Sequence, residues 1–252
     1  MTRTIAPAPR VVVGIVVVAT AAVVALAMGA CGPVKARDAG EQLFHDPRIA
    51  GSELNAFSCA TCHAMGEKDG SIKAGFDLKG AAKRTRFWGG YSRSLLDATN
   101  DCLVFFMRGV PLTKDDPKAR ALYEYLADEA KPEKAVTQMP LTVVENISIV
   151  GKQGASRGQQ VWDAACKACH GDPHSGNGRL TDTASIVPED SQALAPELVK
   201  QQGGDVATTT KLIVIEKIRH GAFFGVGGTM ALFSKEQMSD DDIGALLSYL
   251  GL

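Results

Sequence analysis

The sequence predicts an all-α protein in which two tandem helical domains follow an N-terminal targeting segment. Three observations support this fold class. Apolar residues recur at helical spacing, strand-like alternation is scarce, and the pentapeptide Cys-x-x-Cys-His occurs twice in similar surroundings. We place the first domain at 37–130, a linker at 131–154 and the second domain at 155–252. Each domain then has about 100 residues, a common size for one domain.

Residues 1–30 are excluded from the fold because they have the features of an export signal. Arg3 and Arg10 give a basic start, and residues 11–30 are almost wholly apolar. The run Met-Gly-Ala-Cys that ends at Cys31 resembles the signal of bacterial lipoproteins, which implies that Cys31 is lipidated and becomes the first mature residue. The alternative is an uncleaved anchor, since about 20 apolar residues can span a bilayer. In both cases we expect the domains on the periplasmic side of the cell envelope, attached to the membrane.

The two pentapeptides are Cys59-Ala-Thr-Cys62-His63 and Cys166-Lys-Ala-Cys169-His170. This pattern is typical of c-type haem attachment. Cysteines three positions apart lie on the same face of a helical turn, so both sulfurs reach one porphyrin edge. The histidine that follows is placed to bind the iron as its proximal ligand. The sequence therefore predicts two covalently attached c-type haems.

Two other uses of paired cysteines fit less well. The two cysteine pairs of a zinc site are usually about 15–20 residues apart. Here the first pair ends at Cys62 and the second begins only at Cys166, which is much farther along the chain. A dithiol redox motif would need a thioredoxin-like βαβ context, and the sequence has no such pattern. Haem attachment is the interpretation that explains both motifs.

A helix is expected before each motif. Gly40 and Phe44 precede the first motif, and Gly158 and Trp162 precede the second. Each glycine lies four positions before its aromatic residue, so the two share one helical face. Glycine at that position lets a second backbone approach closely.

A second helix is expected at the end of each domain. Asp116 is a candidate N-cap with Pro117 at the first helical position, and Ser239 is a candidate N-cap followed by the acidic residues 240–242. The apolar stripes of these helices are Ala121, Leu122, Tyr125 and Leu126 in the first domain, and Ile243, Leu246, Leu247 and Leu250 in the second. The aromatic partner for the first helix of each domain is Tyr123 or Tyr125 in the first domain and Tyr249 in the second. Between the domains, prolines and glycines break regular structure in 131–154, although the apolar stretch 141–150 has the alternative of packing between the domains.

A helix before the haem motif that crosses a closing helix resembles the class I cytochrome c fold, over most of 37–130 and 155–252. In that family a methionine on a loop before the closing helix fills the sixth iron position. Met230 stands there in the second domain, and the preceding Ile218-Arg219-His220-Gly221 is also similar to the family. Met238 is the alternative, but it directly precedes the Ser239 cap, where an apolar residue usually packs on the helix start. His174 is expected in solvent, and His220 is expected to bond to the backbone or to a haem propionate.

The first domain has no methionine between Gly109 and Pro117, so another residue fills the sixth position or it is open. Of the six cysteines, four are assigned to haem and Cys31 to lipid, which leaves Cys102. Cys102 and Met107 are the two candidates, and both residue types are known haem ligands. They are about 140° apart around a helix, so one helix is not expected to offer both to the same iron. Cys102 has the further alternative of a small buried apolar residue.

The segment around Cys102 resembles diheme thiosulfate dehydrogenases and related sulfur-oxidising cytochromes, in which a cysteine five residues before Met-x-Gly ligates the catalytic haem. The resemblance implies that Cys102 is the distal thiolate, and the upstream run 88–90 (Trp-Gly-Gly) is similar as well. Three arginines have the alternatives of binding an anionic substrate, pairing with haem propionates or being solvated: Arg84, Arg86 and Arg108. The stretch 40–63 also resembles the first haem segment of bacterial diheme peroxidases, where His45 has the alternatives of iron ligand and local hydrogen bonder.

The charge balance excludes one class of partner. The chain has 27 basic and 28 acidic residues, and the basic residues are scattered, so nucleic-acid binding is not expected. The sequence favours a membrane-tethered diheme cytochrome c that carries single electrons between redox protein partners. The alternatives are a thiosulfate dehydrogenase-like enzyme acting through Cys102 and a haem-bearing subunit of a larger oxidoreductase. An electron carrier is favoured over a catalyst.

Overall fold

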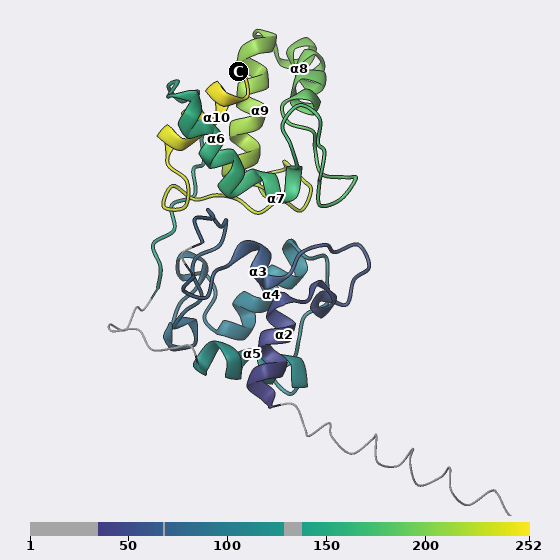
Figure 1. The fold of residues 1–252 in the computed structure, drawn as a ribbon, viewed down its shortest axis with the longest axis vertical. Helices are drawn as coiled ribbons and strands as arrows, with labels where there is room; N and C mark the ends of the chain where they lie inside the picture. The colour runs from purple at the N-terminus through teal and green to yellow at the C-terminus, as the bar shows by residue number, and fades with distance from the viewer. Residues whose placement is uncertain (1–34, 68, 129–137) are drawn as a thin grey trace, which may run out of the picture. The chain divides into compact units, whose positions relative to one another are not determined.

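The structure is a computed structural model that describes residues 35–67, 69–128 and 138–252 (Figure 1). Within these ranges the regular structure is helical, apart from one isolated bridge between Phe87 and Ser92. The prediction of an all-α fold is therefore confirmed. Residues 36–252 form one compact unit, and we call 36–128 its first half and 138–252 its second half. The export signal and Cys31 lie outside the described residues, and within these no helix is long and apolar enough to cross a membrane.

The first half contains four α-helices linked by loops and short 3₁₀ turns. In chain order the helices are α2 (Ala36–His45), α3 (Cys59–Cys62), α4 (Leu95–Phe105) and α5 (Pro117–Asp128). The α5 helix begins as expected, because the Asp116 carboxylate accepts a hydrogen bond of 2.8 Å from the Lys118 backbone N–H. The helix α2 packs against α5.

The contact between α2 and α5 depends on a glycine. A Cβ atom on Gly40 would overlap the backbone carbonyl of Ala121 and the Cβ of Tyr125. Beyond this close approach, the ring of Phe44 lies 5.6 Å from the ring of Tyr125. Gly40 and Phe44 thus lie on the face of α2 that contacts α5, as their spacing predicted, and Tyr125 of α5 is the aromatic partner of Phe44.

The second half repeats this crossing with different neighbours. Its elements are α6 (Ala155–Val161), the π-helical turn η4 (Trp162–Cys166), α7 (Lys167–His170), α8 (Glu189–Gln202), α9 (Val206–His220) and α10 (Asp240–Tyr249). The helix α6 packs against α10, and a Cβ on Gly158 would overlap the Ala245 carbonyl. Ser239 caps α10 by accepting a hydrogen bond of 3.1 Å from the Asp242 backbone N–H.

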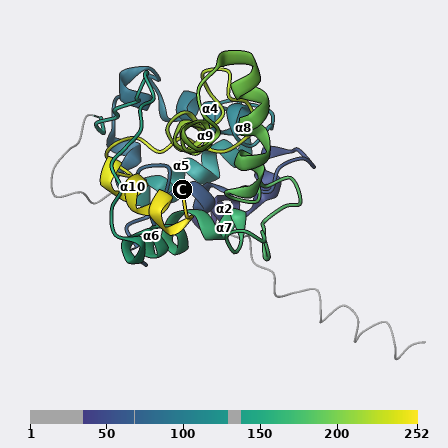
Figure 2. The same cartoon turned by 90° about the horizontal axis from the view of Figure 1, so that it is seen from above.

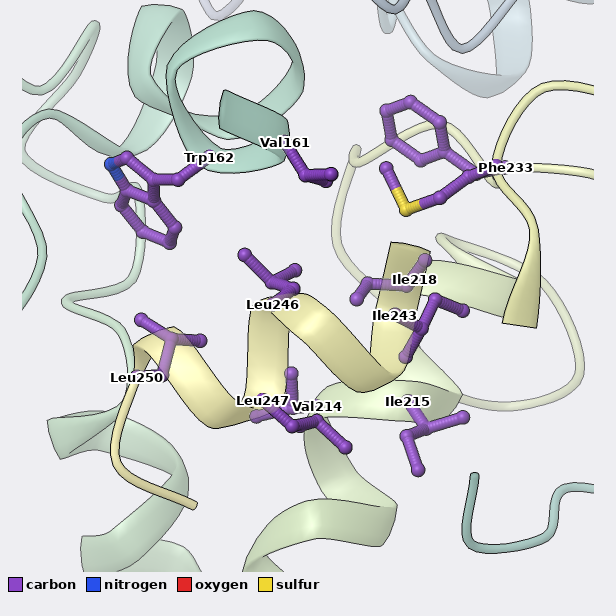
Figure 3. Close-up of a cluster of buried hydrophobic side chains, with 11 residues drawn as sticks. Val161, Trp162, Val214, Ile215, Ile218, Phe233, Ile243, Leu246, Leu247 and Leu250 are labelled. Carbon is purple, nitrogen blue, oxygen red and sulfur yellow. The ribbon is translucent and has the colours of Figure 1, made fainter. Parts of the chain in front are cut away.

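The core of the second half forms around α10. Figure 3 shows Leu246 and its neighbours on α10, with Val161 and Trp162 to one side and the α9 residues Val214 and Ile215 to the other. Trp162 is only 1% exposed. Burying side chains of this size contributes about 1.5–3 kcal/mol each, so the aromatic residue before the motif anchors the helix that leads into it.

The helices α8 and α9 were not placed by the sequence analysis. They pack side by side, and Figure 2 shows α8 beside α9, which is seen along its axis. The helix α9 begins at Asp205, whose carboxylate accepts a hydrogen bond of 2.8 Å from the Thr208 N–H. The helix α8 contains Pro196 in its interior, a residue that normally argues against a helix.

The end of the predicted linker contacts both the first half and the core around α10. Leu141 lies 3.6 Å from the position that a Cβ on Gly89 would take. Thr142 bonds to the Glu236 carboxylate through its N–H at 2.9 Å, and Ile147 and Val150 pack against the core around α10. The apolar stretch 141–150 therefore follows the alternative in which it packs, rather than forming an exposed connection.

Candidate haem-binding sites

The first motif lies on a single helical turn. The turn α3 contains both Cys59 and Cys62, and it is fixed at its start because the Ser58 N–H donates to Thr61 Oγ1 at 3.0 Å. Both cysteines are part of the wall of one cavity. Cysteines at positions i and i+3 therefore face the same space, as the attachment of one haem requires.

His63 is oriented by the backbone that follows it. Its Nδ1 donates to the Phe76 carbonyl at 2.7 Å, which leaves Nε2 without its proton and available as a metal ligand. A Cβ on Gly75 would overlap the imidazole ring, so the ring can lie here only against glycine. Burial lowers the pKa of His63, which further favours the neutral imidazole that binds iron.

His170 has the same orientation in the second motif. Its Nδ1 donates to the Ser185 carbonyl at 2.8 Å, so Nε2 is again the ligating nitrogen. The local helix differs, because Cys166 ends the π-helical turn η4 whereas Cys169 lies in α7. Trp162 supports the turn by donating from Nε1 to the Gly171 carbonyl at 3.1 Å.

These residues fit a c-type haem better than a thiolate site. Burial raises the pKa of the Cys59 and Cys166 thiols to about 12 and that of Cys62 to about 11. Reactive dithiols and zinc ligands need an easily formed thiolate. The cavity beside His63 is instead lined mainly by apolar and aromatic side chains, which suits a flat apolar macrocycle, and each motif has a histidine with Nε2 available.

Both candidates for the sixth position of the first haem lie at this cavity. Cys102 and Met107 are in its wall together with His63. The helical separation of about 140° does not apply to this pair, because α4 ends at Phe105 and Met107 lies beyond it. Burial, together with Cys59, Cys62 and Asp101, raises the pKa of Cys102 above that of an ordinary thiol. Cys102 would therefore become a thiolate ligand only with the help of the iron charge.

Two of the three predicted arginines reach the same cavity. Arg84 and Arg86 are among its lining residues, and Arg84 is held by a hydrogen bond of 2.6 Å from Nη2 to the Asp77 carbonyl. Burial lowers the pKa of Arg84, although a guanidinium keeps its charge at any physiological pH. Arg108 is exposed and is not a lining residue. Arg84 and Arg86 are therefore placed to interact with a group in this cavity, whereas Arg108 is not.

Met230 lies on the glycine-rich loop between α9 and α10 and packs, half-buried, against the core of the second half. Met238 is 1% exposed within that core, as expected of a residue that packs on a helix start. His220 donates from Nε2 to the Val144 carbonyl at 2.7 Å, so it serves the backbone. His174 is exposed but bonds to Glu189 at 2.7 Å, a partner that the sequence analysis did not name.

The cavity of the first half also includes residues from the second. Leu141, Ala231 and Leu232 are part of its wall. An aromatic cluster lies beside it, with the rings of Trp88 and Phe106 stacked at 5.8 Å and the edge of Phe223 at 5.5 Å from Phe106. Sequence spacing gave no signal for these contacts, because they join segments that are far apart in the chain.

The comparison with known protein families assigns the second half. Residues 153–250 match the family described as cytochrome C oxidase, cbb3-type, subunit III. None of the curated proteins compared with the chain matches it. The matched range includes the whole second motif and Met230. The match supports a c-type cytochrome domain at 153–250, with covalently bound haem and a role in haem-based electron transfer.

Proposed function

We propose that the protein is a membrane-tethered diheme cytochrome c that passes single electrons between redox proteins. The observation that carries this proposal is that both motif histidines have the same hydrogen bond from Nδ1 to a backbone carbonyl. His63 and His170 each donate from Nδ1 to a backbone carbonyl, at 2.7 and 2.8 Å. Two unrelated loops would have little reason to orient an imidazole identically unless Nε2 had the same task in both.

The chain's own residues supply attachment, orientation and exclusion of water. Each cysteine pair holds a haem, which when bound supplies an iron that cycles between two oxidation states. Cytochrome c domains generally transfer electrons to redox partners. We propose Met230 as the distal ligand of the second site and Cys102 or Met107 as that of the first. A methionine ligand raises the potential relative to a thiolate, so the second site would be the higher in potential if Cys102 is the ligand of the first.

The proposal of two haems is tested by mass and by titration. Protein expressed with haem-attachment machinery is expected to carry two covalent haems per chain, and both are expected to take up one electron each in a spectroelectrochemical titration. A mass that corresponds to one haem would contradict the proposal. Release of the chain from membranes by detergent, together with a lipid-modified Cys31 in the mass spectrum, tests the tether.

The ligands are tested by two variants. Met230→Ala is expected to abolish the weak long-wavelength absorption of an iron–methionine bond, and retention of that band would remove Met230 from the proposal. Cys102→Ser is expected to change the low-spin EPR signal of the first haem only. Met107→Leu is the matched variant, and a changed signal there with an unchanged signal in Cys102→Ser would assign the position to Met107.

A second candidate function is sulfur-anion oxidation at the first haem. The observation that favours it is the location of Cys102, Arg84 and Arg86 at one cavity with His63. Two guanidinium groups there would attract an anion such as thiosulfate. Purified protein mixed with thiosulfate under exclusion of oxygen tests this directly. If thiosulfate reduces neither haem at any pH, this function is excluded.

A third candidate is a haem-bearing subunit of a larger oxidoreductase. The observation that favours it is that the family matching 153–250 is described as an oxidase subunit. Affinity purification of the tagged protein from its native membrane is the test. Recovery of the chain alone, with electron transfer to a soluble acceptor intact, would contradict the subunit role.

A further inference from the structure

The two attachment motifs meet at one short segment of the first half. Residues 70–75, which we call the bridging loop, follow His63 along the chain. The Ile72 N–H donates to the Ala164 carbonyl at 2.9 Å, and Ala164 lies in η4, two residues before Cys166 of the second motif. Ile72 and Ala74 also pack against the core that contains Trp162. The bridging loop is therefore attached to the second motif by both backbone and side chains.

Lys73 lies in the chain between Ile72 and Ala74, the two residues that contact the second half. Its Nζ donates to the Ala60 carbonyl at 2.9 Å, and Ala60 lies between the two cysteines of the first motif. The side chain is half-buried. The ammonium group is thus fixed beside the first motif, while the residues on either side of Lys73 in the chain contact the second half.

The Lys73 ammonium lies within electrostatic reach of one cysteine of each motif, Cys62 and Cys169. These two cysteines are also within electrostatic reach of each other. Charges in a partly buried place are weakly screened.

We infer that the Lys73 ammonium raises the reduction potential of both haem sites, so that a single side chain adjusts the two ends of one electron-transfer step. Reduction adds one electron to a site, and a nearby positive charge stabilises the product of that addition. The inference rests on the proposed function, because it requires a haem at each motif. It goes beyond that function by naming the residue that links the two sites.

The test is a redox titration of variants that differ in the charge at one position. Lys73→Met removes the ammonium and keeps the apolar stem, and Lys73→Gln keeps a hydrogen-bond donor for the Ala60 carbonyl without the charge. Both variants are expected to lower the midpoint potentials of both haems. Lys73→Arg keeps the charge and is expected to leave both potentials near their wild-type values.

Two matched controls remove the same charge elsewhere. Lys118→Met changes an exposed residue of α5, and Lys200→Met changes an exposed residue of α8. Their potentials are expected to stay at wild-type values. Unchanged potentials in Lys73→Gln, a shift in one haem alone, or an equal shift in the controls would each overturn the inference. A wild-type protein that titrates with fewer than two haems would overturn the proposed function as well, and so the two failures are distinguishable.

Discussion

The two halves share a helix crossing and a Cys-x-x-Cys-His motif but differ in the segment before the closing helix. In the second half a glycine-rich loop between α9 and α10 carries Met230, which packs against the core. In the first half the corresponding stretch is short, and the cavity wall is completed by Cys102 and by Leu232 of the other half. The difference teaches that the glycine–aromatic crossing can be repeated while the segment that would supply a distal ligand changes.

The largest expected effect comes from removing one pair of cysteines at a time. The double variant C59A/C62A is expected to lose the covalent haem of the first half and any thiolate-type EPR signal. The double variant C166A/C169A is expected to lose the other haem and the iron–methionine band. Mass spectrometry and optical spectra check both outcomes. A methionine band that survives in C166A/C169A would reverse the assignment of the two halves.

The shared helix crossing is expected to be equally sensitive in both halves. Gly40→Val and Gly158→Val would each drive a side chain into a backbone carbonyl, of Ala121 and Ala245 respectively. Overpacking of this kind destabilises by about 1–3 kcal/mol and occasionally more. Thermal unfolding followed by circular dichroism measures the loss. Gly154→Ala is the control, because a Cβ there meets nothing within 4 Å.

A failure of this symmetry would be informative. If Gly158→Val unfolds the protein while Gly40→Val has no effect, the crossing supports only the second half. The similarity of α2–α5 to α6–α10 would then not extend to their role in stability.

A buried arginine of the second half, Arg219, and an exposed arginine of the first half, Arg108, are expected to behave differently. Arg219 is 2% exposed and donates to the carbonyls of Phe233 and Met238 at 3.1 and 2.7 Å and to Asp240 at 2.6 Å. Arg219→Met leaves these acceptors unpaired, at about 1–3 kcal/mol for each buried one, so we expect a loss of about 3 kcal/mol. Arg108 is exposed, and Arg108→Met is expected to stay within about 0.5 kcal/mol. Chemical denaturation measures both, and equal losses would contradict the difference in burial.

The smallest expected effect concerns acid stability of the second half. Burial alone would raise the pKa of Glu236, but the hydrogen bonds from the Thr142 N–H and hydroxyl outweigh it and lower the pKa to about 2 from the ordinary 4.5. A carboxyl with a lowered folded-state pKa stabilises the protein above about pH 4.5, and this contribution is lost as the pH falls toward 2. The effect is small because the side chain is exposed and screened.

Unfolding of Glu236→Gln as a function of pH checks this prediction. The variant is expected to be slightly less stable than wild type at pH 7 and to approach it at low pH. A difference that is independent of pH would show that the carboxylate charge has no part in holding Thr142.

The sequence predicted the elements whose signals are local. The caps at Asp116 and Ser239, the glycine–aromatic pairs and the motifs depend on residues within one or two turns, and the helices begin where these residues indicated. The helix α8 was missed because Pro196 in its interior conceals the helical pattern. The hydrogen-bond acceptors of the two histidine Nδ1 atoms are the carbonyls of Phe76 and Ser185. They could not be predicted from the sequence, since every residue has a carbonyl.

The bridging loop and the shared cavity wall were missed for a different reason. Ile72 and Ala164, or Trp88 and Phe223, are brought together only by the packing of the two halves. No periodicity within either segment contains that information. Residues of this kind, including Lys73, are visible only once the long-range contacts are known.

The attachment of residues 138–150 has a practical consequence for dissecting the molecule. The family match begins at 153, so an excised fragment would naturally be started there. Such a fragment would lack the Val144 carbonyl that accepts from His220, and it would lack Ile147 and Val150, which pack against the core around α10. The boundary defined by similarity therefore cuts through a set of native contacts. A fragment that begins at Gln138 would keep them, and its melting temperature should exceed that of the shorter piece.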